Sequence, residues 1–349
     1  MPRDYDEEDP EYQEEEEQPE EEEQPEEEPA EEEEKEAEEE EEVDWAYSTC
    51  QGNKKAVFIG INYTGGSAPL SGCHNDVSNL HEFITTNYGY DEAEVKIFLD
   101  DDEDPETQPT RENIIAALHW LVEGASQDDA LFLHYSGHGG TQADADGDEA
   151  DGTDETICPI DYETNGQIVD DELHSILVKP LPKGCRLTVI FDACHSGSGL
   201  DLPYTYGTDG EVETKKTAED TVFALEQAVK AHGEGDMNAL ELAARQMSLA
   251  ATGGTDAAKE KTKKTRTHPA DVVYLSGCQD IQYSADATED GRATGALSHA
   301  FVKTLTDNPE QSYHELLVNI REILVEGNYT QIPQLSSSHP MDTSLGFII

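Results

Sequence analysis

The chain has 349 residues, and its 79 acidic side chains against 21 basic ones give a net charge of −58 at pH 7. Such a charge disfavours nucleic acid and anionic membranes as partners and favours cationic ones. No apolar run approaches the roughly 20 residues that cross a bilayer, and no basic start with an apolar core indicates a secretory leader, so we expect a cytoplasmic location, with the nucleus left open.

Residues 1–44 are nearly all Glu, Pro and Gln, with 28 acidic side chains and only Arg3 and Lys35 as basic ones. Their charge of −26 leaves −32 for residues 45–349. A segment that repels itself and has almost no apolar side chains cannot offset the entropy lost on ordering. We therefore expect residues 1–44 to be disordered and residues 45–349 to form the folded domain.

From Trp45 onward, short apolar runs alternate with segments of helical periodicity. The runs are apolar throughout, which favours parallel strands that are covered on both faces. The strands are predicted at 55–63, 94–100, 130–136, 186–193 and 271–277. The helices between them are predicted at 76–89, 110–125 and 170–181. This alternation indicates an α/β fold with a doubly wound sheet.

Two of the strands end in glycine-rich turns, HYSGHGG with His138 and DACHSGSG with Cys194. Functional sites of such sheets form where the carboxyl ends of the strands meet. An imidazole can take the proton of a thiol, and the resulting thiolate is a strong nucleophile. A buried structural cysteine and histidine are the alternative, but both residues lie in strand-end turns, which favours catalysis.

Metal sites of two common kinds are disfavoured. The six cysteines contain no CxxC pair, so we expect free thiols rather than structural zinc. HYSGH places two histidines four apart, but on a strand-like run and without the Glu of zinc-binding helices. The acidic run 144–155 matches several calcium-loop positions, yet Glu149 replaces the required glycine, so it is no EF-hand.

Asp192 precedes Cys194 by two residues, so both side chains point to one face of the strand. A carboxylate beside a thiol raises the pKa of that thiol and opposes catalysis. A cationic substrate side chain would neutralise this carboxylate. The pairing therefore favours substrates with Arg or Lys and disfavours cleavage after Asp.

HYSGHGG and DACHSGSGLDLPYTYGT together resemble the type I metacaspases, especially the fungal ones. LSGCHNDV (70–77), DGDEADGTDE (146–155) and DVVYLSGCQDIQYSADA (271–287) extend the resemblance, whereas the caspase motif QACRG is absent. The resemblance implies a caspase-like three-layer sandwich, with a mostly parallel sheet and helices on both faces. It also implies a large-subunit-like part (about 45–204), a variable helical or flexible insertion (205–270) and a small-subunit-like part (271–349).

By this resemblance the protein is a monomeric cysteine endopeptidase that cleaves proteins after Arg or Lys, is stimulated by Ca2+ and has a role in cell death or protein quality control. Cys194 is the implied nucleophile, His138 the acid and base, and the backbone N–H groups of Gly139 and Cys194 the oxyanion donors. The implied substrate pocket consists of Asp192, Asp76, Cys73 and Ser136. The implied calcium ligands are Asp154, Asp170, Asp171 and Asp201. For Asp76, Asp170 and Asp171 the alternative is a carboxylate favoured at the start of a helix.

Residues 205–270 depart from the compact pattern, with helices predicted at 217–232 and 235–250 and a flexible segment at 251–270. A flexible chain that carries basic residues is a substrate for an enzyme of this specificity. The expected self-cleavage positions are Lys264 and Arg266, followed by Lys215 and Lys216, and then by the 50–55 segment. Two other functions remain open: an inactive scaffold in protein clearance, and a peptidase that cleaves after Asp or Asn.

Overall fold

The computed structural model describes residues 43–143, 153–193, 199–207, 261–277, 286–289, 292–329 and 331–349. Residues 1–42 of the predicted acidic segment 1–44, the predicted helices at 217–232 and 235–250, and Cys194 lie outside these residues. Within the described part, every helix is too short or too polar to cross a bilayer.

The centre of the molecule is a sheet of seven strands in the order β2-β1-β3-β7-β9-β12-β8. The first five strands run parallel, and β12 pairs antiparallel with both β9 and β8. The strands are β1 (Lys54–Gly60), β2 (Val95–Leu99), β3 (Ala130–Ser136), β7 (Arg186–Asp192), β8 (Tyr204–Tyr206), β9 (Asp271–Ser276) and β12 (Gln334–Ser337). The five predicted strands are confirmed, whereas β8 and β12 were not predicted.

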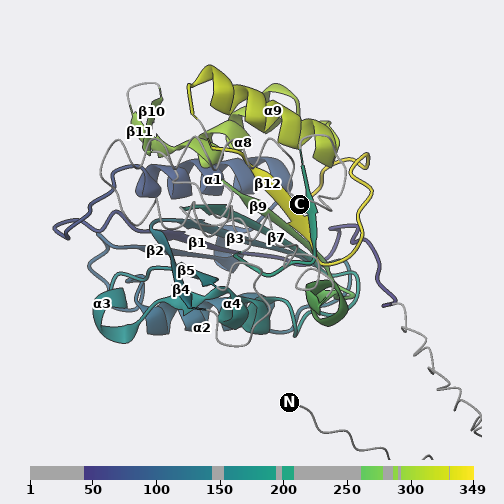
Figure 1. Cartoon of the computed structure of the whole chain (residues 1–349), viewed down its shortest axis with the longest axis horizontal. Helices are drawn as coiled ribbons and strands as arrows, with labels where there is room; N and C mark the ends of the chain where they lie inside the picture. Colours follow the sequence, from purple (N-terminus) through teal and green to yellow (C-terminus); the bar gives the residue numbers. More distant parts are fainter. Residues whose placement is uncertain are drawn as a thin grey trace, which may run out of the picture. The chain divides into compact units, whose positions relative to one another are not determined.

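Helices cover both faces of this sheet (Figure 1). One face carries α1 (Cys73–Tyr88), α8 (Ala296–Asp307) and α9 (Tyr313–Glu326), and the other carries α2 (Arg111–Val122) and α4 (Asp170–Leu177). Polar caps fix two of the starts: the Thr110 side chain accepts from the Asn113 N–H, and Ser312 forms a capping box with Glu315. The predicted three-layer α/β sandwich, with a mostly parallel sheet and helices on both faces, is confirmed.

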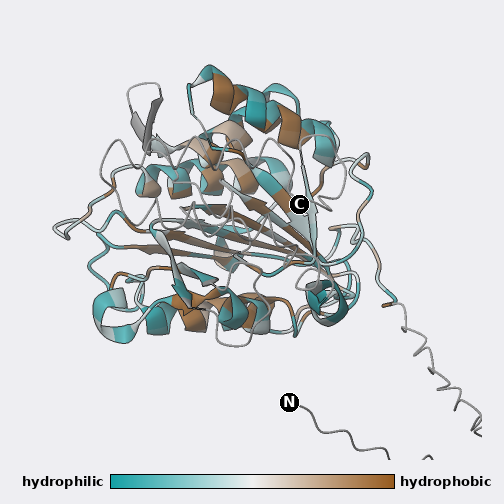
Figure 2. Ribbon diagram, viewed as in Figure 1, coloured by the Kyte–Doolittle hydropathy of each residue, from teal (hydrophilic) through white to brown (hydrophobic). Residues whose placement is uncertain are grey.

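Alternating side chains divide the core into two layers. On β7, Leu187, Val189 and Phe191 pack toward α2 and α4, whereas Ile190 packs toward α1, α8 and α9. The same alternation places Asp192 on the Ile190 face, which is the side of α1 and α8. Figure 2 shows apolar strands between helices whose apolar faces turn inward. The strand register thus decides which helices the strand-end side chains meet.

Smaller elements surround the carboxyl edge of the sheet. A three-stranded sheet consists of β4 (Gly139–Ala143), β5 (Thr153–Ile157) and β6 (Ile168–Val169), and a hairpin of β10 (Asp286–Glu289) and β11 (Arg292–Gly295) leads directly into α8. Two further short elements are the 3-10 turn η1 (Glu92–Glu94) and the helix α3 (Tyr162–Asn165). The sequence analysis did not predict α8, α9 or these small sheets.

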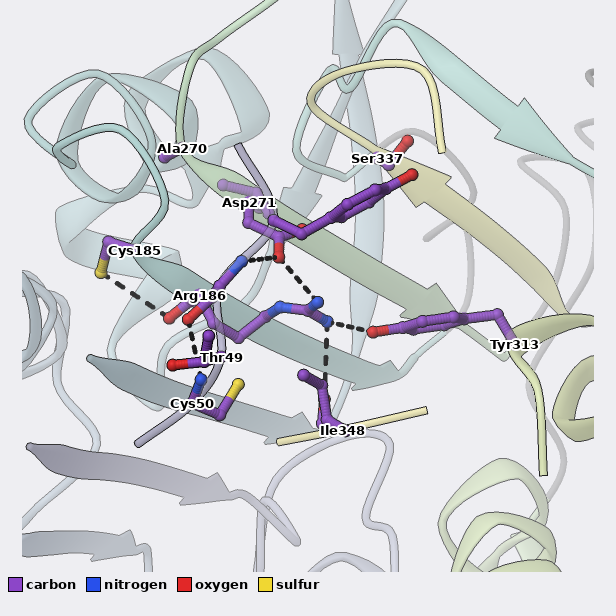
Figure 3. Close-up of polar contacts among 12 residues, drawn as sticks. Thr49, Cys50, Cys185, Arg186, Ala270, Asp271, Tyr313, Ser337 and Ile348 are labelled. Atoms are coloured by element: carbon purple, nitrogen blue, oxygen red, sulfur yellow. Dashed lines mark hydrogen bonds and ion pairs between the residues drawn. The ribbon is translucent and has the colours of Figure 1, made fainter. Parts of the chain in front are cut away.

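The opposite end of the sheet is closed by a buried ion pair between Arg186 on β7 and Asp271 on β9 (Figure 3). The Arg186 guanidinium lies 2.8 Å from Asp271 and donates to the Tyr313 hydroxyl at 2.5 Å and to the Ile348 carbonyl at 3.5 Å. Burial raises the pKa of Asp271, but Arg186 and further donors outweigh this and lower it. The pair ties the sheet to the start of α9 and to the C-terminal residues.

Candidate active site

The ends of β3 and β7 define the site. Ser136 and Asp192 are register partners on these neighbouring parallel strands, and each is the last residue of its strand. His138 follows Ser136 by two residues, as Cys194 follows Asp192. Equal spacing beyond paired strand ends brings both turns to the same edge of the sheet. Cys194 itself lies outside the described residues.

The His138 imidazole has a defined hydrogen-bonding orientation. Its Nε2 lies 2.7 Å from the carbonyl oxygen of Ala68. A carbonyl can only accept, so Nε2 carries the proton and donates, and in the neutral ring Nδ1 holds the lone pair. His138 can therefore accept a proton at Nδ1 without changing its contact with Ala68. This is the arrangement that a general base needs.

Two tyrosines hold the turn that carries His138. The Tyr63 hydroxyl accepts from the His138 backbone N–H at 3.0 Å and donates to the Cys158 carbonyl at 2.6 Å. The Tyr135 hydroxyl donates to the His138 carbonyl at 2.7 Å. A Cβ on Gly137 would lie 2.7 Å from the Tyr135 hydroxyl, so only glycine fits between them. The backbone of the turn is thus fixed on both sides.

Asp76 and Asp192 form an acidic pair beneath this edge. Asp76 is on the first turn of α1, and both carboxylates are almost completely buried. Ser136, which adjoins Asp192 across the strands, donates its hydroxyl proton to Asp76 Oδ2 at 2.7 Å. Cys73 lies buried one turn before Asp76 on the same helix. The structure therefore gathers the four residues of the predicted substrate pocket around the ends of β3 and β7.

The two carboxylates of the acidic pair lie close enough to repel each other in a site that is shielded from water. Burial and the neighbouring Asp192 raise the pKa of Asp76, and hydrogen bonds from Thr294, Ser136 and Gly295 offset only part of this rise. Two buried carboxylates that interact in this way favour a shared proton or a bound cation. A guanidinium or ammonium group is the cation that peptide substrates can supply.

The other histidine of HYSGH, His134, has a different environment. It is completely buried on β3, and burial lowers the pKa of His134 to about 3, so the ring is neutral at pH 7. Its Nε2 lies 3.2 Å from the Ser298 hydroxyl on α8. His134 is therefore a core residue under the pocket, whereas His138 lies at its rim.

The four predicted calcium ligands lie near one another around the start of α4. Both carboxylate oxygens of Asp170 accept backbone N–H groups, from Glu155 at 2.7 Å and from Asp171 at 2.8 Å. Burial, together with the carboxylates of Asp201 and Asp154, raises the pKa of Asp170. Within the described part of the chain, however, no three side chains of metal-binding type converge on one point. The carboxylate donors suit calcium chemically, but their arrangement here does not.

A basic side chain lies against these aspartates instead. The Arg266 guanidinium forms an ion pair with Asp171 and lies 3.6 Å from Asp201, and its side chain is only 7% exposed. Residues 261–266 are helical, although the sequence predicted a flexible segment there. That prediction was wrong for these residues, because apolar patterning cannot reveal an ion pair with distant carboxylates. Lys264 shares this helix, and Lys215 and Lys216 lie outside the described residues.

Comparison with known proteins decides the family. Residues 54–203 match the family model described as "Metacaspase, peptidase C14 domain". Metacaspase-1 of Eremothecium gossypii is 51% identical over 311 residues, which cover 88% of this chain and 69% of that protein. The chain belongs to the metacaspase family. It is a type I member of the fungal kind, because its curated matches include fungal metacaspase-1 proteins at about 50% identity.

The match covers only part of the relatives. Metacaspase-1A of Neurospora crassa is 51% identical over 303 residues, 87% of this chain but 66% of its own length. This metacaspase therefore spans about two thirds of several of its relatives. The crystal structure of protein GSU0716 from Geobacter sulfurreducens has a TM-score of 0.51 at 24% identity, over 83% of this chain and 95% of that one. That likeness concerns the fold alone. The predicted family is confirmed, and with it a cysteine-type peptidase.

Proposed function

We propose that this metacaspase is a calcium-stimulated endopeptidase that cleaves proteins after Arg or Lys, with Cys194 as nucleophile and His138 as general base and acid. The observation that carries the proposal is the buried pair of Asp76 and Asp192 at the same sheet edge as His138. A cationic side chain would neutralise this pair, whereas an Asp side chain would add a third negative charge. Cleavage after Asp is therefore disfavoured.

The proposed reaction begins with a proton transfer from the Cys194 thiol to His138 Nδ1, the ring atom that holds the lone pair. The thiolate then attacks the carbonyl carbon of the scissile bond, and the carbonyl oxygen becomes an oxyanion. The backbone N–H groups of Gly139 and Cys194 are its proposed donors. Protonated His138 next gives its proton to the leaving amine, which departs with one half of the substrate.

The second half of the reaction releases the acyl group. His138 takes a proton from a water molecule, and the hydroxide attacks the carbonyl carbon of the thioester. The carbon–sulfur bond breaks, and the proton on His138 returns to the Cys194 sulfur. The Ala68 carbonyl accepts the Nε2 proton of His138 throughout the reaction, both when the ring is neutral and when it is the imidazolium cation.

Calcium stimulation and self-processing belong to the same proposal. Carboxylate oxygens are the donors that calcium prefers, and Asp154, Asp170, Asp171 and Asp201 would supply them after rearrangement. We further propose a monomer, in which β8, only three residues long, forms a short edge of the sheet. A cytoplasmic or nuclear role in cell death or protein quality control is the matching biological proposal.

Hydrolysis of matched peptides tests this function. Peptides that differ only in Arg, Lys, citrulline or Asp at the cleaved position should be compared with and without calcium, using Cys194→Ala as control. We expect cleavage of the Arg and Lys peptides, stimulation by calcium and no activity in Cys194→Ala. A wild-type protein that cleaves none of them would favour the inactive scaffold, and preference for Asp would refute the pocket.

A further inference from the structure

The acidic pair has hydrogen-bond donors from a segment to which the sequence assigned no role, the junction of β11 and α8. The Thr294 hydroxyl donates to Asp76 Oδ1 at 2.5 Å, and the Gly295 N–H donates to the same oxygen at 2.7 Å. The Ser298 N–H, in the first turn of α8, donates to Asp192 Oδ2 at 2.8 Å. One short segment therefore contacts both carboxylates, although it lies more than 100 residues from either in sequence.

Two glycines allow this segment to come so close. A Cβ on Gly295 would lie 2.2 Å from Asp192 Oδ2 and 2.8 Å from Asp76 Oδ2, so any side chain there would displace the carboxylates. A Cβ on Gly72, before α1, would lie 2.8 Å from the backbone of Thr294. Gly295 has an ordinary φ of −71°, so space rather than backbone conformation requires glycine there. The backbone of Gly295 thus packs against both carboxylates.

These contacts fix how Asp76 faces Asp192. Thr294 and Gly295 hold one oxygen of Asp76, and Ser136 holds the other, so the plane of the carboxylate cannot rotate. The N–H groups at the start of α8 favour the negative charge of Asp192. Asp76 Oδ2 and Asp192 Oδ2 both lie beside Gly295 and are within about 5 Å of each other. At this distance their charges interact strongly.

We propose that Thr294 and Gly295 are specificity-determining residues for a basic side chain at the cleaved position. Thr294 is a positioning residue that acts through Asp76, and Gly295, which has no side chain, lets the backbone lie against both carboxylates without displacing them. The inference rests on the proposed function, because it needs the acidic pair to bind a guanidinium or ammonium group. It adds that the small-subunit-like part of the chain contributes to the selectivity by orienting Asp76 and Asp192.

Substitutions of Thr294 separate positioning from a general structural effect. Thr294→Val removes the hydroxyl and keeps the shape, whereas Thr294→Ser keeps the hydroxyl. Thr304→Val is the matched control, because Thr304, on α8, is likewise buried and its hydroxyl has no hydrogen-bond partner in the described part of the chain. The substrates are an Arg peptide and its citrulline analogue, which has nearly the same shape without the charge.

We expect Thr294→Val to lower the preference for Arg over citrulline about tenfold or more, through a higher KM for the Arg peptide. Cleavage of the citrulline peptide should stay at the wild-type rate, and Thr294→Ser and Thr304→Val should keep the wild-type preference. Gly295→Ala should lose Arg preference at least as strongly, while Cys194 still reacts with uncharged iodoacetamide. A merely structural role would lower cleavage of both peptides equally.

Two results would overturn different statements. If the wild-type enzyme does not prefer Arg over citrulline, the proposed function is wrong. If it does, and Thr294→Val keeps the wild-type preference, the inference about Thr294 is wrong while the function stands. Should Thr294→Val not fold, Thr294→Cys keeps the volume with a weaker donor, and an unchanged preference in that variant would likewise refute the inference.

Discussion

The Tyr63 ring lies against the His138 ring, with centroids 4.5 Å apart, while its hydroxyl accepts the backbone N–H of the same histidine. Tyr63 adopts a φ of +49°, a region that bulky residues rarely occupy. Such a conformation costs about 1–3 kcal/mol and persists only where the surroundings require it. Through its ring and its hydroxyl, Tyr63 holds His138, the proposed base, in place.

Tyr63→Phe should therefore lower kcat about tenfold with little change in KM, because it removes the hydroxyl that fixes the His138 backbone. Steady-state kinetics on the Arg peptide measures both constants. His138→Ala should cost about 10²- to 10⁴-fold, and the double variant should be no slower than His138→Ala alone, since Tyr63 acts through His138. The exposed His119→Ala is the control. A double variant with additive losses would contradict this role.

The raised pKa of Asp76 predicts how stability changes with pH. Between the ordinary carboxyl pKa near 4 and the higher pKa in the folded state, the folded protein binds more protons than the unfolded one. The contribution of Asp76 to stability is therefore present at low pH and is lost as the pH rises through its folded pKa. Asparagine does not titrate, so Asp76→Asn should not lose stability in this way as the pH rises.

Urea unfolding of wild type and Asp76→Asn at pH 5 and pH 8 tests the sign. We expect Asp76→Asn to gain at least about 1 kcal/mol relative to wild type between the two pH values. The exposed Asp307→Asn serves as the control for a change of net charge, and it should show no such gain. No such gain would mean that the Asp76 carboxyl is already ionised at pH 5 in the folded protein, and would refute the raised pKa.

The sequence predicted the sheet because the parallel strands are buried on both faces, which leaves continuous apolar runs such as ALFLHYS in β3. It did not predict β8 and β12, which have three and four residues and no apolar run. His138 and Asp192 could be found because each lies at or just after the end of such a run. Their neighbours across the fold could not.

Thr294 shows why. Its contact with Asp76 joins residues 218 positions apart, and nothing in the local sequence ATGALSHA marks a hydroxyl aimed at a carboxylate. Arg266 illustrates the same limit in the other direction. Flanking Thr and Lys residues indicate a flexible segment, but Asp171 and Asp201 supply charges that bury the guanidinium. Contacts between distant parts of the chain decide such cases.

The buried pair of Arg186 and Asp271 gives a prediction for stability. Arg186→Met leaves the Asp271 carboxylate buried without its cation, which should cost about 3–5 kcal/mol of unfolding free energy. The double variant Arg186→Met/Asp271→Asn should recover part of that loss, because it removes the unpaired charge. Lys303→Met breaks an exposed pair and should cost less than about 1 kcal/mol. Denaturant unfolding distinguishes these values, and a loss under 1 kcal/mol in Arg186→Met would refute the assignment.

The ion pairs of Arg266 predict competition between this side chain and calcium. If calcium binds Asp171 and Asp201, the guanidinium must leave them, since both cations need the same carboxylate oxygens. Removing the guanidinium then removes the competitor. Arg266→Gln should bind calcium about tenfold more tightly than wild type, as measured by calorimetry in the Cys194→Ala background, where self-cleavage cannot interfere.

Accessibility of the helical residues 261–266 gives an independent measurement, because a protease needs several extended residues at the bond it cuts. In the same Cys194→Ala background, trypsin should cut after Arg266 slowly without calcium and faster with it, since displaced Arg266 no longer anchors the helix. Lys303→Gln makes the same change of net charge at an exposed site and should leave both calcium affinity and trypsin cleavage unchanged. Equal calcium affinity in Arg266→Gln and wild type, with calcium-independent cleavage at 261–266, would show that Arg266 is only a structural counterion. Tighter calcium binding in Arg266→Gln, with calcium-dependent cleavage at 261–266, would show that displacement of Arg266 by calcium exposes a self-cleavage position.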